Sequence, residues 1–299
     1  MLVFENDGEI DPRLITLMGV NIKEKNNAIG YFGTGLKYAI ACLLRWNDRI
    51  IIQSGQSEFH FTYEPSRIRD TDINIITMRS KLGSLQLGFT TELGKNWKPW
   101  MIYRELWCNM QDEPSARMYE TAITMVPQLD KTRVIVDGPS IMQAYAERDK
   151  WVLNRDTVPL IHKDDALEIY DTPSNTIFYR GIVVQWNSNA SRYLYNILSH
   201  VYLTEDRVAP SWATDPIIVQ SVASMKNENI IKNVLLAGAD DLERRFSYGR
   251  ENTPSFVWEQ AAQDLLENHP IAVNPSVREM YKTIAGVARC PTCNRPLEG

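Results

Sequence analysis

Residues 27–45, "NAIGYFGTGLKYAIACLLR", place three glycines, Gly30, Gly33 and Gly35, directly before an amphipathic helix. Apolar side chains then follow at the i, i+3, i+4, i+7, i+8 spacing of a helix packed on a core: Leu36, Ala39, Ile40, Leu43 and Leu44. Glycine lets a ligand approach the backbone closely, and the N–H groups and dipole of a helix N-terminus favour an anion. The segment therefore fits a phosphate-binding turn, and it equally fits a tight strand-to-helix turn without a ligand.

Composition limits the classes of protein to consider. The chain has 299 residues, 44% of them hydrophobic and 23% charged, which is enough for one large domain or two. A net charge of −5 argues against a broad DNA-binding face, although a local basic groove stays open. No apolar run is long enough for a membrane span, and the first residues do not resemble a signal peptide. Four cysteines do not suggest a disulfide framework, so we expect a reducing, cytoplasmic location.

The order of the expected elements predicts an α+β fold. Strands are expected at residues 2–5, 49–55, 58–64, 73–79, 84–91, 132–138, 167–172 and 176–186. Helices are expected after the glycines and at residues 99–113, 216–225, 227–246 and 255–269. The four strands between residues 49 and 91 are short and close together, which favours an antiparallel meander. Composition shifts from strand-like to helix-like near residue 208, so we expect domains at 1–207 and 208–299.

The helix expected at residues 99–113 carries a second polar group. Glu105, Asn109 and Asp112 are spaced i, i+4 and i+7, so they share one helix face. Such a stripe is most often only a solvated surface. Carboxamide and carboxylate oxygens also suit Mg²⁺, and a carboxylate nearby can orient or deprotonate an attacking water. Together with a phosphate-binding turn, this helix would supply what a nucleoside-triphosphate site needs.

Three segments resemble motifs of the GHKL superfamily, the Bergerat-fold ATPases. They are "ENDGEI" at residues 5–10, "IGYFGTGLKYA" at 29–39 and "ELWCNMQDE" at 105–113. In that family the Glu/Asn helix comes first, whereas here it comes last of the three. The resemblance therefore implies a circularly permuted Bergerat fold, with a mixed, largely antiparallel sheet and helices on one face, followed by a helix-rich C-terminal region.

The resemblance also implies roles for individual residues. Glu105 would be the general base, Asn109 the Mg²⁺ ligand, and Asp112 would lie near the adenine or support the site. The phosphate-binding residues would be Gly30, Gly33, Thr34, Gly35 and Lys37. The ammonium of Lys37 would pair with phosphate, and the residue equally fits a solvated surface lysine. Glu5 is the first choice for the carboxylate that binds the adenine amino group, and Asp7 is the second. Asp137 also ends a strand and ranks below both, because no glycine-rich turn follows it.

These assignments favour an ATP-binding protein that is a slow, Mg²⁺-dependent ATPase acting as a nucleotide-driven switch. The alternative is a non-hydrolysing nucleotide-binding or interaction protein, such as an accessory factor of a virus or mobile element. Nucleic acid, a protein partner and a homodimer remain open, and no membrane partner is expected. The pair Cys290 and Cys293 is half of a zinc ribbon, and no second pair follows it. A zinc site there would need histidine ligands or another chain, so it stays open as the less favoured interpretation.

Overall fold

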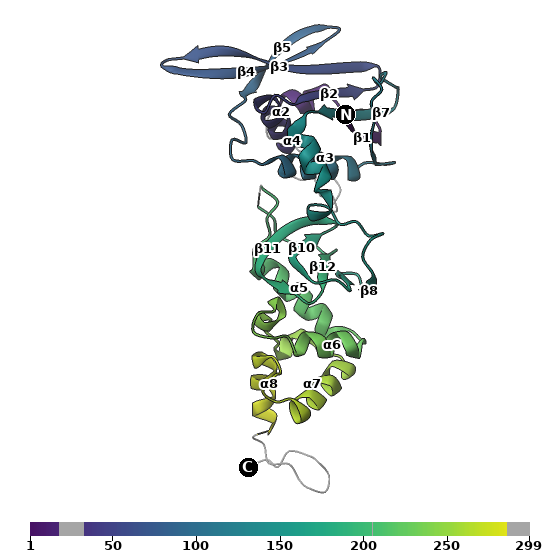
Figure 1. The fold of residues 1–299 in the computed structure, drawn as a ribbon, viewed down its shortest axis with the longest axis vertical. Helices are drawn as coiled ribbons and strands as arrows, with labels where there is room; N and C mark the ends of the chain where they lie inside the picture. Colours follow the sequence, from purple (N-terminus) through teal and green to yellow (C-terminus); the bar gives the residue numbers. More distant parts are fainter. Residues whose placement is uncertain (18–32, 205, 286–299) are drawn as a thin grey trace. The chain divides into compact units, whose positions relative to one another are not determined.

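The computed structural model describes residues 1–17, 33–204 and 206–285 of the chain (Figure 1). It divides into two compact units, Met1–Val152 and Leu153–Gly299. Both units combine helices with a sheet, which confirms the α+β class. Gly30, Cys290 and Cys293 lie outside the described residues, so the structure says nothing about their predicted roles.

The first unit is built on a seven-stranded antiparallel sheet. Its strands are β1 (Leu2–Asp7), β2 (Arg49–Ser54), β3 (Ser57–Ile68), β4 (Thr71–Ser80), β5 (Gly83–Thr90), β6 (Arg117–Glu120) and β7 (Lys131–Asp137). Their spatial order is β5-β4-β3-β2-β7-β1-β6. Strands β2 to β5 form the meander expected from their spacing, and β1 lies between β6 and β7.

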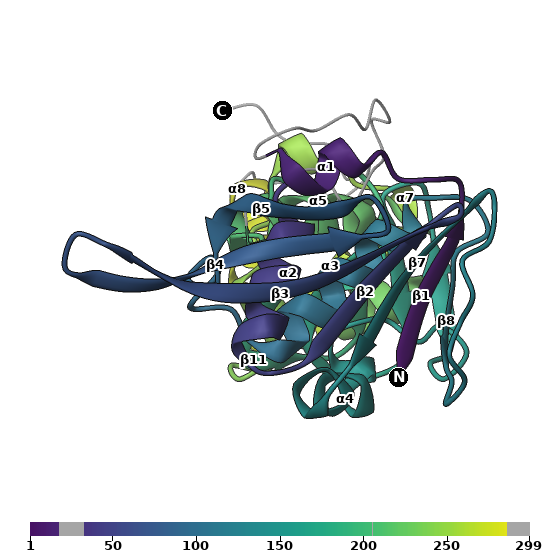
Figure 2. The same ribbon diagram turned by 90° about the horizontal axis from the view of Figure 1, so that it is seen from above.

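Helices cover one face of this sheet (Figure 2). They are α1 (Pro12–Thr16), α2 (Gly35–Arg45), α3 (Pro99–Gln111) and α4 (Pro139–Ala146), followed by the short η1 (Arg148–Lys150). The core between helices and sheet contains Leu2 and Phe4 of β1, and the ring of Phe4 meets Tyr103 of α3 edge-on. Because side chains alternate along a strand, Glu5 points to the opposite face of the sheet.

Two local signals explain where these helices begin. Pro99 occupies the first turn of α3, where its missing N–H costs nothing. Helix α4 follows Gly138, and its first turn is capped by a distant carboxylate: Asp48 accepts hydrogen bonds from the backbone N–H groups of Ser140 and Ile141. This remote cap connects the end of β7 to the turn between α2 and β2.

The second unit contains a five-stranded sheet of order β11-β10-β12-β9-β8. Its strands are β8 (Leu160–Lys163), β9 (Leu167–Tyr170), β10 (Ser174–Tyr179), β11 (Ile182–Ser191) and β12 (Leu194–Ile197). Its helices are α5 (Ser211–Ser224), α6 (Glu228–Leu235), η2 (Leu242–Arg245), η3 (Arg250–Asn252), α7 (Phe256–Asn268) and α8 (Pro275–Ala285). Only the pair β10–β12 is parallel among the described ladders of this sheet.

The composition shift near residue 208 falls inside the second unit. Helix α5 begins just after it and packs against β9 and β12. The contacts therefore divide the chain after Val152, earlier than the change from strand-like to helix-like sequence. The helix expected at residues 227–246 is also divided, into α6 and the short η2.

Among residues 1–17, 33–204 and 206–285, each helix is too short or too polar to cross a bilayer.

Candidate functional site

Helix α3, which carries Glu105 and Asn109, and the glycine turn before α2 are far apart in sequence but meet in the first unit. Glu105 of α3 is 4% exposed, and its carboxylate lies against Gly35, the first residue of α2. A Cβ built on Gly35 would lie 1.9 Å from Oε1 of Glu105, so only glycine leaves room for the carboxylate in this position. The positive end of the α2 dipole favours a carboxylate there.

Asn109 lies one turn further along α3 and contacts the same carboxylate. Its Nδ2 donates a hydrogen bond of 3.1 Å to Oε1 of Glu105. This bond orients both side chains and leaves the carboxamide oxygen of Asn109 for another partner. Asp112 lies past the last residue of α3, where it forms the C-cap. The structure thus joins Glu105 and Asn109 directly and places Asp112 at the end of the helix.

The described part of the glycine turn is held by main-chain and lysine hydrogen bonds. Gly33 has a φ of 64°, a conformation that favours glycine. Thr34 is the N-cap of α2, and its carbonyl accepts a hydrogen bond from the N–H of Lys37. The Lys37 side chain is 1% exposed and donates to the carbonyl oxygens of Gly33 (2.8 Å) and Leu14 (2.6 Å). Burial lowers the pKa of Lys37.

Glu5 is engaged on the other face of the sheet. Its carboxylate accepts hydrogen bonds from Arg133 (2.6 Å), Tyr119 (2.9 Å) and Arg117 (2.8 Å). Burial raises the pKa of Glu5, but these hydrogen bonds outweigh it and lower the pKa to about 2. Glu5 is therefore a buried, fully paired anion.

Asp7 lies on the same face as Glu5, two residues along β1, and pairs with Lys131 at 2.7 Å. Neither carboxylate lies on the helix-covered face of the sheet, which is the side where α3 and Glu105 lie. Asn6, between them, is on the helix-covered face by the alternation of the strand. No sequence pattern distinguishes Asn6 as a site residue, because Leu2, Val3 and Phe4 are all apolar and do not reveal which face the helices cover.

The donor set at Glu105 and Asn109 fits Mg²⁺ better than a softer metal. Within the described residues no three His, Cys, Asp or Glu side chains gather in a way that would hold a metal ion. Mg²⁺ needs no such cluster, because it takes few protein ligands and keeps several waters or phosphate oxygens. The carboxamide oxygen of Asn109 and the adjacent carboxylate supply hard oxygen donors of that kind.

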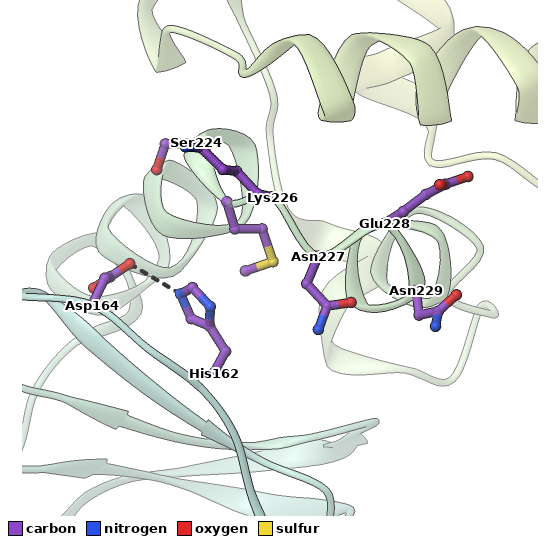
Figure 3. Close-up of a pocket in the computed structure, with 8 residues that line it drawn as sticks. His162, Asp164, Ser224, Lys226, Asn227, Glu228 and Asn229 are labelled. Atoms are coloured by element: carbon purple, nitrogen blue, oxygen red, sulfur yellow. Dashed lines mark hydrogen bonds and ion pairs between the residues drawn. The ribbon is translucent and has the colours of Figure 1, made fainter.

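A separate cavity of about 710 Å³ lies in the second unit (Figure 3). It is lined by residues of β8 and of the turn between α5 and α6, and it includes none of the residues predicted from the three motifs.

Comparison with known proteins adds no relative: no protein-family model, no curated protein and no solved structure matches the chain.

Proposed function

We propose that the first unit binds ATP between the N-terminus of α2 and α3, and hydrolyses it slowly with Mg²⁺ as a conformational switch. The observation that carries this proposal is the position of the Glu105 carboxylate against Gly35. It unites a candidate base with a candidate phosphate-binding turn, as the resemblance to GHKL ATPases requires.

The pairing of β6 with β1 supports the proposed circular permutation. Strand β6 follows α3 directly, and Leu2 of β1 is the cross-strand partner of Glu120 at the end of β6. A short hairpin from Glu120 to Leu2 would give the chain order of the family: Glu/Asn helix, two strands, acidic block, glycine turn. A circular permutation keeps the same strands and helices adjacent in space but connects them in a different order along the chain, as proposed here for α3, β6 and β1.

The proposed reaction assigns one task to each group of residues. Glu105 orients and deprotonates the water that attacks the γ-phosphate in line. Backbone N–H groups at the start of α2 bind phosphate oxygens, assisted by the helix dipole. Bound Mg²⁺, held through the Asn109 oxygen, would supply charge neutralisation on the phosphates. Lys37 holds the glycine turn in shape through Gly33 and adds a positive charge behind it.

ATP binding and ATP hydrolysis, measured for the wild-type protein and for Glu105→Ala, test this proposal. Retained binding with hydrolysis reduced by about 10² or more is expected, because a positioned base contributes roughly that factor. A wild-type protein that binds no ATP in the presence of Mg²⁺ would refute it.

The second candidate is a nucleotide-binding protein without turnover. It is favoured by the placement of Glu5 and Asp7, the acids first considered for adenine, on the face opposite Glu105. A site with an amide, Asn6, in place of a carboxylate would read the purine more weakly than the family's acid does. Hydrolysis by wild type that equals hydrolysis by Glu105→Ala, with ATP binding intact in both, would favour this candidate.

A further inference from the structure

Strand β5 forms one edge of the seven-stranded sheet, and its outer side is open. Among the described strands it has a single neighbour, β4. Residues 83–86 are exposed, and further along only Leu87 and Phe89, which belong to the core under the helices, are buried. Outside the ladders, no backbone hydrogen bond between described residues reaches residues 83–89. An open edge of this kind offers its N–H and C=O groups to any strand that can pair with it.

This edge lacks the features that usually keep edge strands from pairing with another chain. Residues 82–91 include no charged residue and no proline. The opposite edge strand, β6, is by contrast only four residues long and carries Arg117 and Glu120. The register of β5 with β4 shifts between Gln86 and Thr90, so the regular part of the open edge is residues 83–86.

The turn before β5 determines which backbone groups point outward. Strands β4 and β5 are joined by a two-residue turn, and Ser80 pairs with Gly83 at its base. The closing pair of such a hairpin is hydrogen-bonded, and hydrogen-bonded pairs alternate with non-hydrogen-bonded pairs along an antiparallel ladder. Gly83 and Leu85 therefore bond to β4, whereas the N–H and C=O groups of Ser84 and Gln86 point away from the sheet.

These outward groups are complementary to themselves. When two copies of β5 pair antiparallel about a two-fold axis at Leu85, Ser84 of each copy faces Gln86 of the other. Each of these outward N–H and C=O groups then has a partner. The two Leu85 side chains meet across the axis on the helix-covered side of the sheet, and in the single chain Leu85 is 50% exposed.

The charges at the two ends of β5 favour the same arrangement. Lys81 precedes the strand and Glu92 follows it, and both side chains are exposed. In an antiparallel pair the lysine end of each copy lies toward the glutamate end of the other, so unlike charges approach each other. A parallel pair would instead bring like charges together.

We propose that β5 is a dimer interface, at which a second copy of this chain pairs antiparallel with the first. The two seven-stranded sheets would become one continuous sheet, with backbone hydrogen bonds and the Leu85 contact at its centre. The interface uses neither Glu105 and Asn109 nor the glycine turn, so it is independent of the ATP site proposed above.

Gln86→Pro tests the backbone hydrogen bonds of this interface. Proline removes the N–H of residue 86, which points outward, so the ladder to β4 keeps its bonds. Each copy loses one donor across the axis. The dimer dissociation constant of the full chain, measured by sedimentation equilibrium, should therefore rise about tenfold or more. Gln86→Thr is the matched control, because it changes the same side chain but keeps the N–H, and it should dimerise as wild type does.

Leu85→Lys and Leu85→Glu locate the two-fold axis. Each variant alone places like charges opposite each other and should be mainly monomeric, whereas an equimolar mixture should associate through unlike charges. Unfolding midpoints close to that of wild type are expected for both, because Leu85 is half-exposed.

Three results would overturn the proposal. One is a wild-type protein that is monomeric at every concentration, which would leave the edge to an unlike chain. Another is a Gln86→Pro variant that dimerises as tightly as Gln86→Thr, and the third is a mixture of the two Leu85 variants that associates no better than either alone. Because none of these variants changes Glu105 or Gly35, the outcomes are separate from any result for ATP.

Discussion

Replacing Gly35 by alanine is the sharpest perturbation of the proposed ATP site. The new Cβ would lie 1.9 Å from Oε1 of Glu105, whereas real Cβ atoms essentially never approach a neighbour within 3.0 Å. The carboxylate must therefore move by about 1 Å. The atom that must move is the far end of a flexible side chain, and Gly35 has ordinary helical geometry, so the fold tolerates the change.

The expected effect is thus on rate rather than on stability. A displacement of about 1 Å of a positioned group costs roughly 10² in rate, which corresponds to about 2.7 kcal/mol of transition-state stabilisation. Alanine in place of glycine in a helix changes stability by at most about 1 kcal/mol in its favour. We therefore expect the rate of ATP hydrolysis to fall about 100-fold. The urea midpoint of unfolding should differ from that of wild type by no more than a typical surface substitution would change it.

The assay is steady-state phosphate release from ATP, with ATP affinity measured in parallel. Gly88→Ala is the matched control, because a Cβ at Gly88 of β5 would meet nothing within 4 Å. Its hydrolysis rate should equal that of wild type. If Gly35→Ala hydrolyses ATP as fast as wild type, the reasoning that places the Glu105 carboxylate in the reaction is refuted.

Three further predictions concern the stability of the two units. Glu5→Gln should destabilise the first unit by about 3 kcal/mol near neutral pH, because it leaves the buried Arg133 without its anion. Urea denaturation measures this loss of unfolding free energy. A loss below about 0.5 kcal/mol, which is typical of a surface substitution, would contradict the prediction. Since the pKa of Glu5 is lowered to about 2, its stabilisation is present above pH 4.5 and is lost as the pH falls toward 2, and the Gln variant should lack this acid dependence. In the second unit, burial raises the pKa of Glu243, whose Oε2 accepts no hydrogen bond from the described residues. Stability should therefore decline as the pH rises from 4.5 through the raised pKa, and Glu243→Gln should abolish that decline in denaturation midpoints; an unchanged slope would sink the idea. Gly138→Ala should cost about 1–3 kcal/mol in thermal unfolding, because φ is +155° and the added Cβ would overlap the Asp48 carboxylate that caps α4.

The helices and strands that carry the candidate site follow from local patterns in the sequence. The spacing of Leu36, Ala39, Ile40, Leu43 and Leu44 predicts α2, and Pro99 predicts the start of α3. The strands that escaped prediction are β6, β8 and β12, which have four residues each and too few alternations to be recognised. They form because neighbouring strands supply the hydrogen-bond partners, which no local pattern reveals.

The orientation of Glu5 could not be predicted for a different reason. A strand presents alternate residues to opposite faces, but the run Leu2–Phe4 is buried on both. Which face receives α2 and α3 depends on contacts far along the chain. The contact of Glu105 with Gly35 is likewise tertiary. The complementary chemistry of the two segments and the resemblance to the GHKL family, rather than periodicity, indicate that they belong together.

Amide hydrogen exchange of the full chain, with and without ATP and Mg²⁺, tests the central claim most directly. If ATP binds where α2 and α3 meet, the backbone amides of residues 33–37 and those around Asn109 should exchange more slowly when nucleotide is added. The reason is that bound phosphates accept hydrogen bonds from the glycine turn and order helix α3. Unchanged exchange in both segments at saturating ATP, or protection confined to residues 153–285, would contradict the account.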